Sequence, residues 1–433
     1  MDQRARDVLN EVGTLKYKYS STIFSLIGVF LERENQIIFK GRTTVEVLRN
    51  IYEDTSIRLW GKIKNHEVTA LNCFIHDSEC WTDKSDNFGE VSITLCPSEI
   101  IIGRCFENEI HVKEISMEIP SLNYMFPNNN LLDHLPTKDN PSILGFSFPA
   151  ALVAEDKYGK LSVHRHLSMS SSIGERKHTI IPRVEYNFDN QMPMREAISR
   201  VAAARNFFSF FANHFIPLGF IEFSDSYKEC GLIINHDEMI DAPYEPFLIS
   251  YTAIEKDFSR IWNNWLLFYE EAPHVSALFY EIICNRSTHT NRFLNLAQAI
   301  EIYSCQYRED YAKTIMKRNN SKRMTLAFRL EDILQYVSDC LTVETNELPC
   351  LAKAISEMRN FYTPYSKNRT EPAYTELVSG SQFLELILLI LVCKKMGIEN
   401  DCISDCSKRA YFSTITQDCE VLSSYYERSN PPK

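Results

Sequence analysis

The sequence lacks the short motifs that mark many nucleotide-dependent and hydrolytic enzymes. It contains no Walker-type phosphate loop, no G-x-S-x-G nucleophile elbow and no dinucleotide-binding fingerprint. Its 13 cysteines form no C-x-x-C pair, and no histidine lies near the group formed by Cys402, Cys406 and Cys419. These absences argue against a nucleotide-driven or hydrolase mechanism and against a zinc site. We therefore expect no metal, no cofactor, and buried thiols in a reducing cytoplasm.

Long apolar runs and excess positive charge are also scarce. The first residues, MDQRARDVLNEV, show no apolar segment after a basic start, so no secretory signal is predicted. The most apolar run, from Phe383 to Val392, has roughly half the length that spans a bilayer, and Glu385 interrupts it. We expect a buried core helix there and no membrane association. The formal net charge of -11 argues against non-specific coating of nucleic acid by the whole surface, but it permits a local basic groove.

The first half of the chain has the alternation of apolar and polar residues that is typical of short strands. It appears in TIFSLIGVFLERENQIIFKG, EVTALNCFI, EVSITL, SEIIIGRCF and KEISMEI, with turn-rich gaps between them. This pattern predicts an antiparallel sheet or a sandwich. One helix is expected at MREAISRVAAARNFFSFFANHF, where apolar residues follow helical spacing.

The pattern changes to helical spacing after Pro243 and Pro246, which mark a predicted linker. Phe293, Leu296, Ile300 and Tyr303, for example, are spaced as one buried helical stripe. With 433 residues the chain is long enough for two or three domains. We predict an α+β protein with a β-rich domain over residues 1–245 and an all-helical bundle over 246–433.

One helix of the second half carries the residues that point to chemistry. Leu351, Ile355, Met358 and Tyr362 in LPCLAKAISEMRNFYT are spaced as one buried helical stripe, and Arg359 and Asn360 are expected at its polar edge. The plain interpretation is that Arg359 pairs with an acid on the surface and that Asn360 helps to end the helix.

Residues 359–364, R-N-F-Y-T-P, resemble the signature of the HEPN ribonucleases, in which an arginine is followed after four to six residues by a histidine. Arg359 and Asn360 match this signature, but Pro364 stands at the histidine position. The order RFLNLAQAIEIY, TLAFRLEDIL, RNFYT is similar to the ApeA-like HEPN domain. The segments IIFKG, VTALNCFI, VKEISMEIPSLNYMF and RVAAARNFFSFFANHFIPLGFIEF resemble the N-terminal domain of ApeA proteins.

The resemblance implies an anti-phage protein that acts by abortive infection through cleavage of RNA, with tRNA as a plausible target. It also implies a homodimer, because HEPN active sites usually form where two copies of the motif meet. The β-rich half would then sense a phage-derived trigger or restrain the helical domain.

Metal-independent RNA cleavage uses the ribose 2′-hydroxyl as its nucleophile, so it needs a proton acceptor and a group that steadies the phosphate. Histidine suits the first task because its pKa lies near neutrality, and arginine suits the second because its planar fork binds two phosphate oxygens. Pro364 removes the proton acceptor and is expected to end or kink the helix. The last histidine of the chain, His289, is expected in a loop between two helices, and it reaches the motif only if the fold brings that loop over it.

The chain as written is therefore predicted to be a weak or inactive nuclease on a nuclease scaffold. The sequence leaves open whether the proline is natural or an inactivating change. Two alternatives also stay open: a non-catalytic RNA- or protein-binding module of the same fold, and a structural helical dimerisation protein without an RNA role.

The densest basic stretch of the chain is a candidate RNA-binding segment. It lies in or beside a connection between two helices, and further cations follow the motif itself. These side chains would bind RNA phosphates and guide substrate to Arg359, or else they simply solvate the surface of an acidic protein. The candidate RNA-binding residues are Lys317, Arg318, Lys322, Arg323, Lys367 and Arg369.

Overall fold

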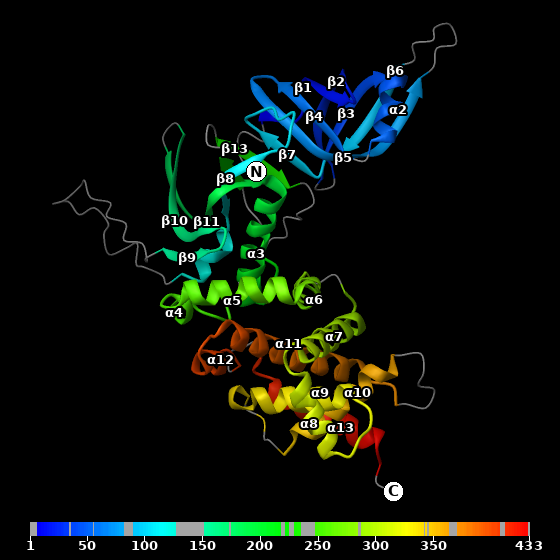
Figure 1. Cartoon of the computed structure of the whole chain (residues 1–433), viewed down its shortest axis with the longest axis vertical. Helices are drawn as coiled ribbons and strands as arrows, with labels where there is room; N and C mark the ends of the chain where they lie inside the picture. The colour runs from blue at the N-terminus through cyan, green and yellow to red at the C-terminus, as the bar shows by residue number, and fades with distance from the viewer. Residues whose placement is uncertain are drawn as a thin grey trace, which may run out of the picture. The chain divides into compact units, whose positions relative to one another are not determined.

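The computed structural model covers the whole chain and forms two compact units (Figure 1). It describes residues 7–33, 36–54, 56–81, 90–126, 151–172, 175–217, 221–224, 229–234, 247–284, 287–341, 343, 346–362, 370–407 and 412–431. The first unit comprises residues 1–123, 129–205 and 216–243, and the second comprises 124–128, 206–215 and 244–433. The first contains all the strands in the described residues and the second is helical, so the predicted α+β class is confirmed.

Six antiparallel strands at the start of the first unit close into a barrel. Their order is β4-β1-β2-β3-β6-β5, and an additional pairing of β5 with β4 completes the ring. The sequence pattern predicted the strands and their antiparallel pairing, but it gave no sign of the closure. The strands are β1 (Val12–Tyr19), β2 (Thr22–Arg33), β3 (Gln36–Thr44), β4 (Ile57–Ile63), β5 (His66–Trp81) and β6 (Glu90–Cys96).

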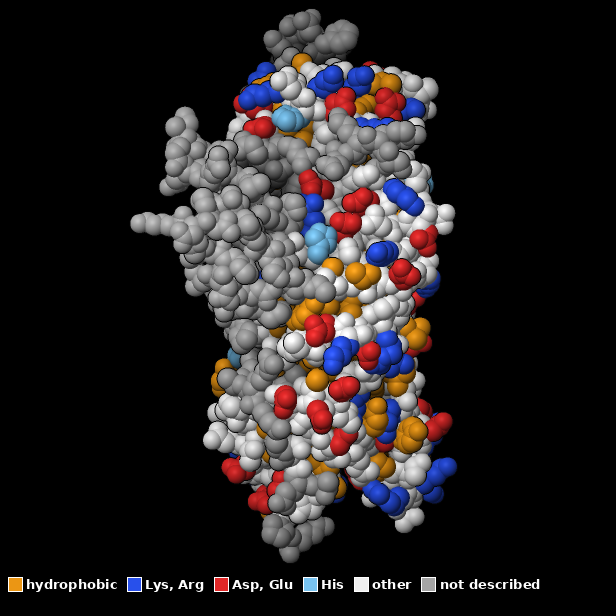
Figure 2. Space-filling view, turned by 90° about the vertical axis from the view of Figure 1, so that its left-hand side faces the viewer, with side chains coloured by type: hydrophobic (Ala, Val, Ile, Leu, Met, Phe, Trp, Pro, Cys, Tyr) orange, Lys and Arg blue, Asp and Glu red, His pale blue; other side chains and the backbone are white. Residues whose placement is uncertain are grey.

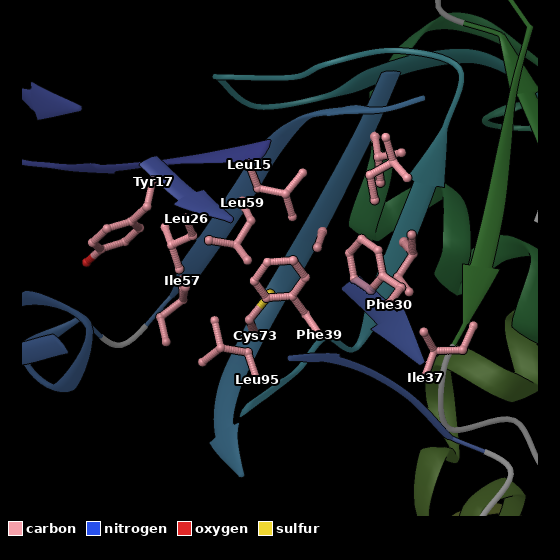
Figure 3. Close-up of a cluster of buried hydrophobic side chains, with 14 of the residues drawn as sticks. Leu15, Tyr17, Leu26, Phe30, Ile37, Phe39, Ile57, Leu59, Cys73 and Leu95 are labelled. Carbon is pink, nitrogen blue, oxygen red and sulfur yellow. The ribbon is translucent and has the colours of Figure 1, made fainter. Parts of the chain in front are cut away.

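The core of the barrel follows from the alternation along each strand. In β1, Leu15 and Tyr17 are fully buried, whereas the residues between and beside them are exposed. Leu15 and Tyr17 belong to one buried cluster with Phe30 and Phe39 of the neighbouring strands (Figure 3). Helix α2 (Val45–Glu53) adds two buried residues to the same cluster. Burial of this apolar surface is the main favourable term in barrel stability, at roughly 25 cal/mol per Å².

Inward-facing glycines make the small barrel possible. Gly28 of β2 pairs with Gly13 of β1 and with Gly41 of β3, so three neighbouring strands lack a side chain at one level. A Cβ atom on Gly28 would lie 2.5 Å from the carbonyl oxygen of Lys40 and 2.5 Å from the ring of Phe39. The missing side chains therefore let the strands approach closely and leave room for the Phe39 ring.

We expect Gly28→Ala to lower the free energy of unfolding by about 1–3 kcal/mol, because the added methyl group overpacks the barrel against backbone. Urea unfolding followed by circular dichroism measures the effect. Ser25→Ala, at an exposed position of the same strand, is the control and should stay within about 0.5 kcal/mol of the parent chain. Equal stabilities for the two variants would contradict this packing argument.

The sheet continues beyond the barrel from β5, in the order β7-β13-β12-β8-β11-β10-β9. These strands are β7 (Glu99–Ile102), β8 (His111–Glu118), β9 (Leu152–Asp156), β10 (Gly159–Ser172), β11 (Glu175–Pro193), β12 (Ile221–Ser224) and β13 (Glu229–Ile234). Helix α3 (Met194–Ala212) occupies the segment in which the sequence predicted a helix.

The second unit is built from helices, as predicted. The stripe of Phe293, Leu296, Ile300 and Tyr303 is buried, with at most 3% of any of these residues exposed. The helices are α4 (Tyr251–Ile254), α5 (Phe258–Glu271), α6 (Pro273–Ile283), α7 (His289–Tyr307), α8 (Glu309–Arg318), α9 (Leu326–Val337), α10 (Leu348–Phe361), α11 (Tyr374–Met396), α12 (Asn400–Ser407) and α13 (Ile415–Ser429).

Helix α11 is the central helix of this unit and contains the most apolar run of the chain. It is long and apolar enough to cross a bilayer, but 89% of its most apolar window is buried within the protein. It packs against α5, α7 and α13 (Figure 1). The expectation of a buried core helix is therefore confirmed.

The acidic residue that interrupts this run is held by two partners. Glu385 is 1% exposed, and it accepts hydrogen bonds from Arg292 at 2.6 Å and from Asn213 at 2.6 Å. Arg292 belongs to α7, and Asn213 follows α3 within the second unit. A buried carboxylate needs such charge-assisted bonds, so the network fixes α11 against the segments that carry its partners.

Candidate functional site

Helix α10 presents the R-N pair at its last turn. Leu351, Ile355 and Met358 are fully buried, which anchors one face of the helix against the bundle. Arg359 is the basic residue of the last turn, and the helix ends at Phe361 with Tyr362 as its C-cap. The helix therefore stops before Pro364, as the sequence predicted. Pro364 itself lies outside the described residues, together with Lys367 and Arg369.

The guanidinium group of Arg359 is held in a partly open position. It donates a hydrogen bond to Glu301 of α7 at 3.2 Å, and another to the side-chain oxygen of Asn360 at 3.4 Å. The side chains of Arg359 and Glu301 are 34% and 31% exposed. An ion pair this exposed contributes at most about 1 kcal/mol, so an incoming phosphate competes with Glu301 for the guanidinium at small cost.

Glu301 is a site residue that sequence reasoning missed. It lies 58 residues before Arg359 in the chain. Its only sequence signal is its place beside the buried Ile300, at the border of the apolar stripe of α7. The plain interpretation, that Arg359 pairs with an acid, holds in the structure.

Asn360 lines a polar hollow of about 460 Å³ beside the motif. The hollow lies among α9, α10, α13 and the segment before α11, and Thr325, Lys353 and Thr370 also line it. Tyr425 of α13 donates a hydrogen bond to the backbone carbonyl of Thr370 at 3.0 Å, which fixes one wall. Lys353 is exposed, with its ammonium group 5.9 Å from the centre of the Tyr426 ring. The hollow thus offers a cation, hydroxyl groups and an amide next to Arg359.

All four cations of the predicted basic stretch that the structure describes lie on the surface, and one of them is paired with an acid. Arg318, in the last turn of α8, pairs with the largely buried carboxylate of Glu331 at 2.6 Å. Lys317 shares that turn, and Lys322 and Arg323 lie in the connection between α8 and α9.

This connection ends at Thr325, the N-cap of α9, which borders the same hollow as Asn360. The structure therefore brings the end of the basic connection to the hollow beside the motif, while Arg318 is engaged by Glu331 although its side chain is 62% exposed.

The sequence placed His289 in a loop between two helices, and this prediction is wrong. His289 is the first residue of α7. Thr288 caps that helix, because its side chain accepts a hydrogen bond from the backbone N–H of Asn291. His289 Nε2 lies 3.0 Å from the hydroxyl of Tyr374.

The next residue along α7, Thr290, is hydrogen bonded to Tyr362 at the end of the motif helix. Burial raises the pKa of Tyr362 above its ordinary value, so this phenol stays protonated at neutral pH and is a poor proton acceptor. The fold therefore brings the start of α7, with the last histidine of the chain, to the end of the motif helix.

Comparison with protein families matches two consecutive parts of the chain. Residues 5–265 match the model of ApeA N-terminal domain 1, and residues 294–402 match the model of the Apea-like HEPN domain. The second match includes Arg359, Asn360 and Glu301, whereas His289 lies before it. Neither the curated proteins nor the solved structures give a match.

Proposed function

This chain belongs to the ApeA family of anti-phage HEPN proteins, and from that premise we propose that it acts by abortive infection through metal-independent cleavage of RNA. The observation that carries the proposal is the R-N pair at the end of α10, within the HEPN match, with an arginine side chain that is one-third exposed. We propose tRNA as the target, because the resemblance implies it.

Arg359 would bind the scissile phosphate in this mechanism. Its fork would leave Glu301 and hold two phosphate oxygens as negative charge builds on them. Asn360 would orient the phosphate or the neighbouring ribose from the rim of the hollow. Lys317, Lys322 and Arg323 would attract the RNA backbone, with Lys367 and Arg369 adding charge beyond the motif.

Pro364 makes this chain a weak or inactive form of the enzyme in our proposal, because no histidine stands at the proton-acceptor position. The second candidate is a non-catalytic RNA-binding member of the same fold, and the same proline favours it. In both cases we propose a cytoplasmic homodimer that forms through the helical unit. The β-rich unit would recognise a phage-derived trigger or restrain the helical unit.

RNA binding by the purified chain tests what these two functions share. We expect Arg359→Ala combined with Lys322→Ala to weaken binding to tRNA at least tenfold, because both changes remove phosphate contacts. Fluorescence anisotropy with labelled tRNA measures the affinity. Lys256→Ala with Lys313→Ala removes the same charge from exposed positions of the same unit, and affinity should hold. A parent chain that binds no RNA would refute both functions.

A further inference from the structure

Three adjacent strands of the barrel, β1, β2 and β3, carry more basic than acidic residues, unlike the acidic chain as a whole. On the face shown in Figure 2, Lys and Arg side chains are interspersed with Asp and Glu. Strands β1, β2 and β3, which are adjacent in the barrel, carry Glu32 as their one acidic residue. Their basic residues are Lys16, Lys18, Arg33, Lys40 and Arg42. A positive surface of this kind on a chain with net charge -11 indicates a polyanionic partner.

Strand register places these cations on one side of the sheet. Leu15 and Tyr17 point into the core, so Lys16 and Lys18 point outward from β1, about 6.8 Å apart at 3.4 Å per residue. Lys40 lies opposite Val29 of β2, and Arg42 lies opposite Ile27. Within the described part of the chain, Lys16, Lys18 and Lys40 form no ion pair.

The same face is hollowed and partly apolar. A depression of about 680 Å³ is lined by Val12, Ile27, Lys40 and Arg42, and Glu79 borders it from β5. Val12 and Ile27 are 68% and 59% exposed. The depression lies over the paired glycines of β2 and β3, where the strands have no inward side chains. A concave face receives a chain, whereas membrane binding favours apolar side chains that protrude into the lipid.

We propose that this face of the barrel is an RNA-binding surface, separate from the motif, which contacts the phosphate backbone of a single strand. Lys16, Lys18 and Lys40 would neutralise phosphates, while Val12 and Ile27 would contact base or ribose surfaces. None of these five residues is aromatic, so none can stack on a base. We therefore expect binding to depend on the RNA phosphate backbone and to show little sequence preference. The choice of RNA over DNA rests on the function proposed above.

The test uses the full chain and a labelled, unstructured 20-nucleotide RNA in fluorescence anisotropy at several salt concentrations. The test variant combines Lys16→Glu, Lys18→Glu and Lys40→Glu, and it should bind the RNA at least tenfold more weakly. The slope of the logarithm of the binding constant against the logarithm of salt concentration should fall in magnitude by about 2, at about 0.7 for each lost phosphate contact. The control variant combines Lys157→Glu, Lys160→Glu and Arg195→Glu, which change the charge by the same amount at other exposed positions of the same unit. Its loss of RNA affinity should be much smaller. Circular dichroism checks that both triple variants are folded.

The outcomes separate this inference from the proposed function. If the parent chain binds RNA and only the Arg359 and Lys322 variant loses it, the barrel inference is wrong and the proposed function stands. If only the barrel variant loses binding, the inference stands and the role of the motif in RNA binding fails. Stronger binding to DNA of the same length, or to vesicles with anionic lipid, would overturn the assignment of RNA to this face.

Discussion

Pro364→His is expected to raise RNA cleavage by roughly 10²- to 10⁴-fold, the usual contribution of one general acid–base group. The change restores a proton acceptor five residues after Arg359 in the sequence, and the Arg359 side chain is already one-third exposed. Expression of the variant from a tightly repressed promoter should stop host growth and fragment tRNA, while the parent chain should do neither. A growth curve and a denaturing gel of total tRNA measure the two effects.

Two further variants identify the cause of such a gain. Pro364→Ala removes the proline without adding a base, so it should stay inactive. Pro364→His combined with Arg359→Ala keeps the base but removes the phosphate ligand, so cleavage should be lost again. If the parent chain already cleaves RNA, another residue serves as the base, and His289→Ala tests the histidine at the start of α7. If no variant cleaves RNA even with phage present, the chain is better described as a binding module.

Arg292→Met is expected to lower the free energy of unfolding of the helical unit by about 3–5 kcal/mol, because it removes the positive charge that pairs with the buried carboxylate of Glu385. Glu385 is 1% exposed, and the amide of Asn213, which also donates a hydrogen bond to it, carries no charge. Urea unfolding followed by circular dichroism measures the loss.

The matched control replaces a cation of an exposed pair. Lys313 lies 3.3 Å from Asp310, which is 94% exposed, so Lys313→Met should cost at most about 1 kcal/mol. Arg292→Met combined with Glu385→Leu removes both charges and should recover most of the loss, because no unpaired charge stays buried. If Arg292→Met costs no more than Lys313→Met, the ion pair does not hold α11 in place.

The helical half was predictable where neighbours along one helix decide the outcome. The stripe from Phe293 to Tyr303 and the stripe from Leu351 to Met358 are buried as their spacing predicts, because residues three or four apart share a helix face. Tyr362, predicted as the last member of the second stripe, is only partly buried, because the helix ends one residue before it. The same local pattern put Arg359 and Asn360 at the polar edge of α10. It did not identify Glu301, because nothing in a helical repeat specifies a partner 58 residues away.

His289 shows how a small local signal was missed. The sequence contains a Thr–His pair before an apolar helical pattern, and threonine is a favourable N-cap. Taking Thr288 as the cap would have placed His289 in the helix rather than in a loop. Its position near the motif has no such signal, since it depends on the packing of α7 beside α10 and α11.

By itself, the sequence determined the change from a strand-rich half to a helical half, the burial of the apolar stripes and the R-N-F-Y-T-P motif with its proline. Each of these depends on residues close together in the chain, whose spacing sets the face on which they lie. Only the tertiary structure decided the closure of the barrel through β4 and β5, the partners of Arg359 and Glu385, and the basic face of β1, β2 and β3. These features depend on which distant segments pack together, and that choice is made by the burial of the whole core and the pairing of its buried polar groups.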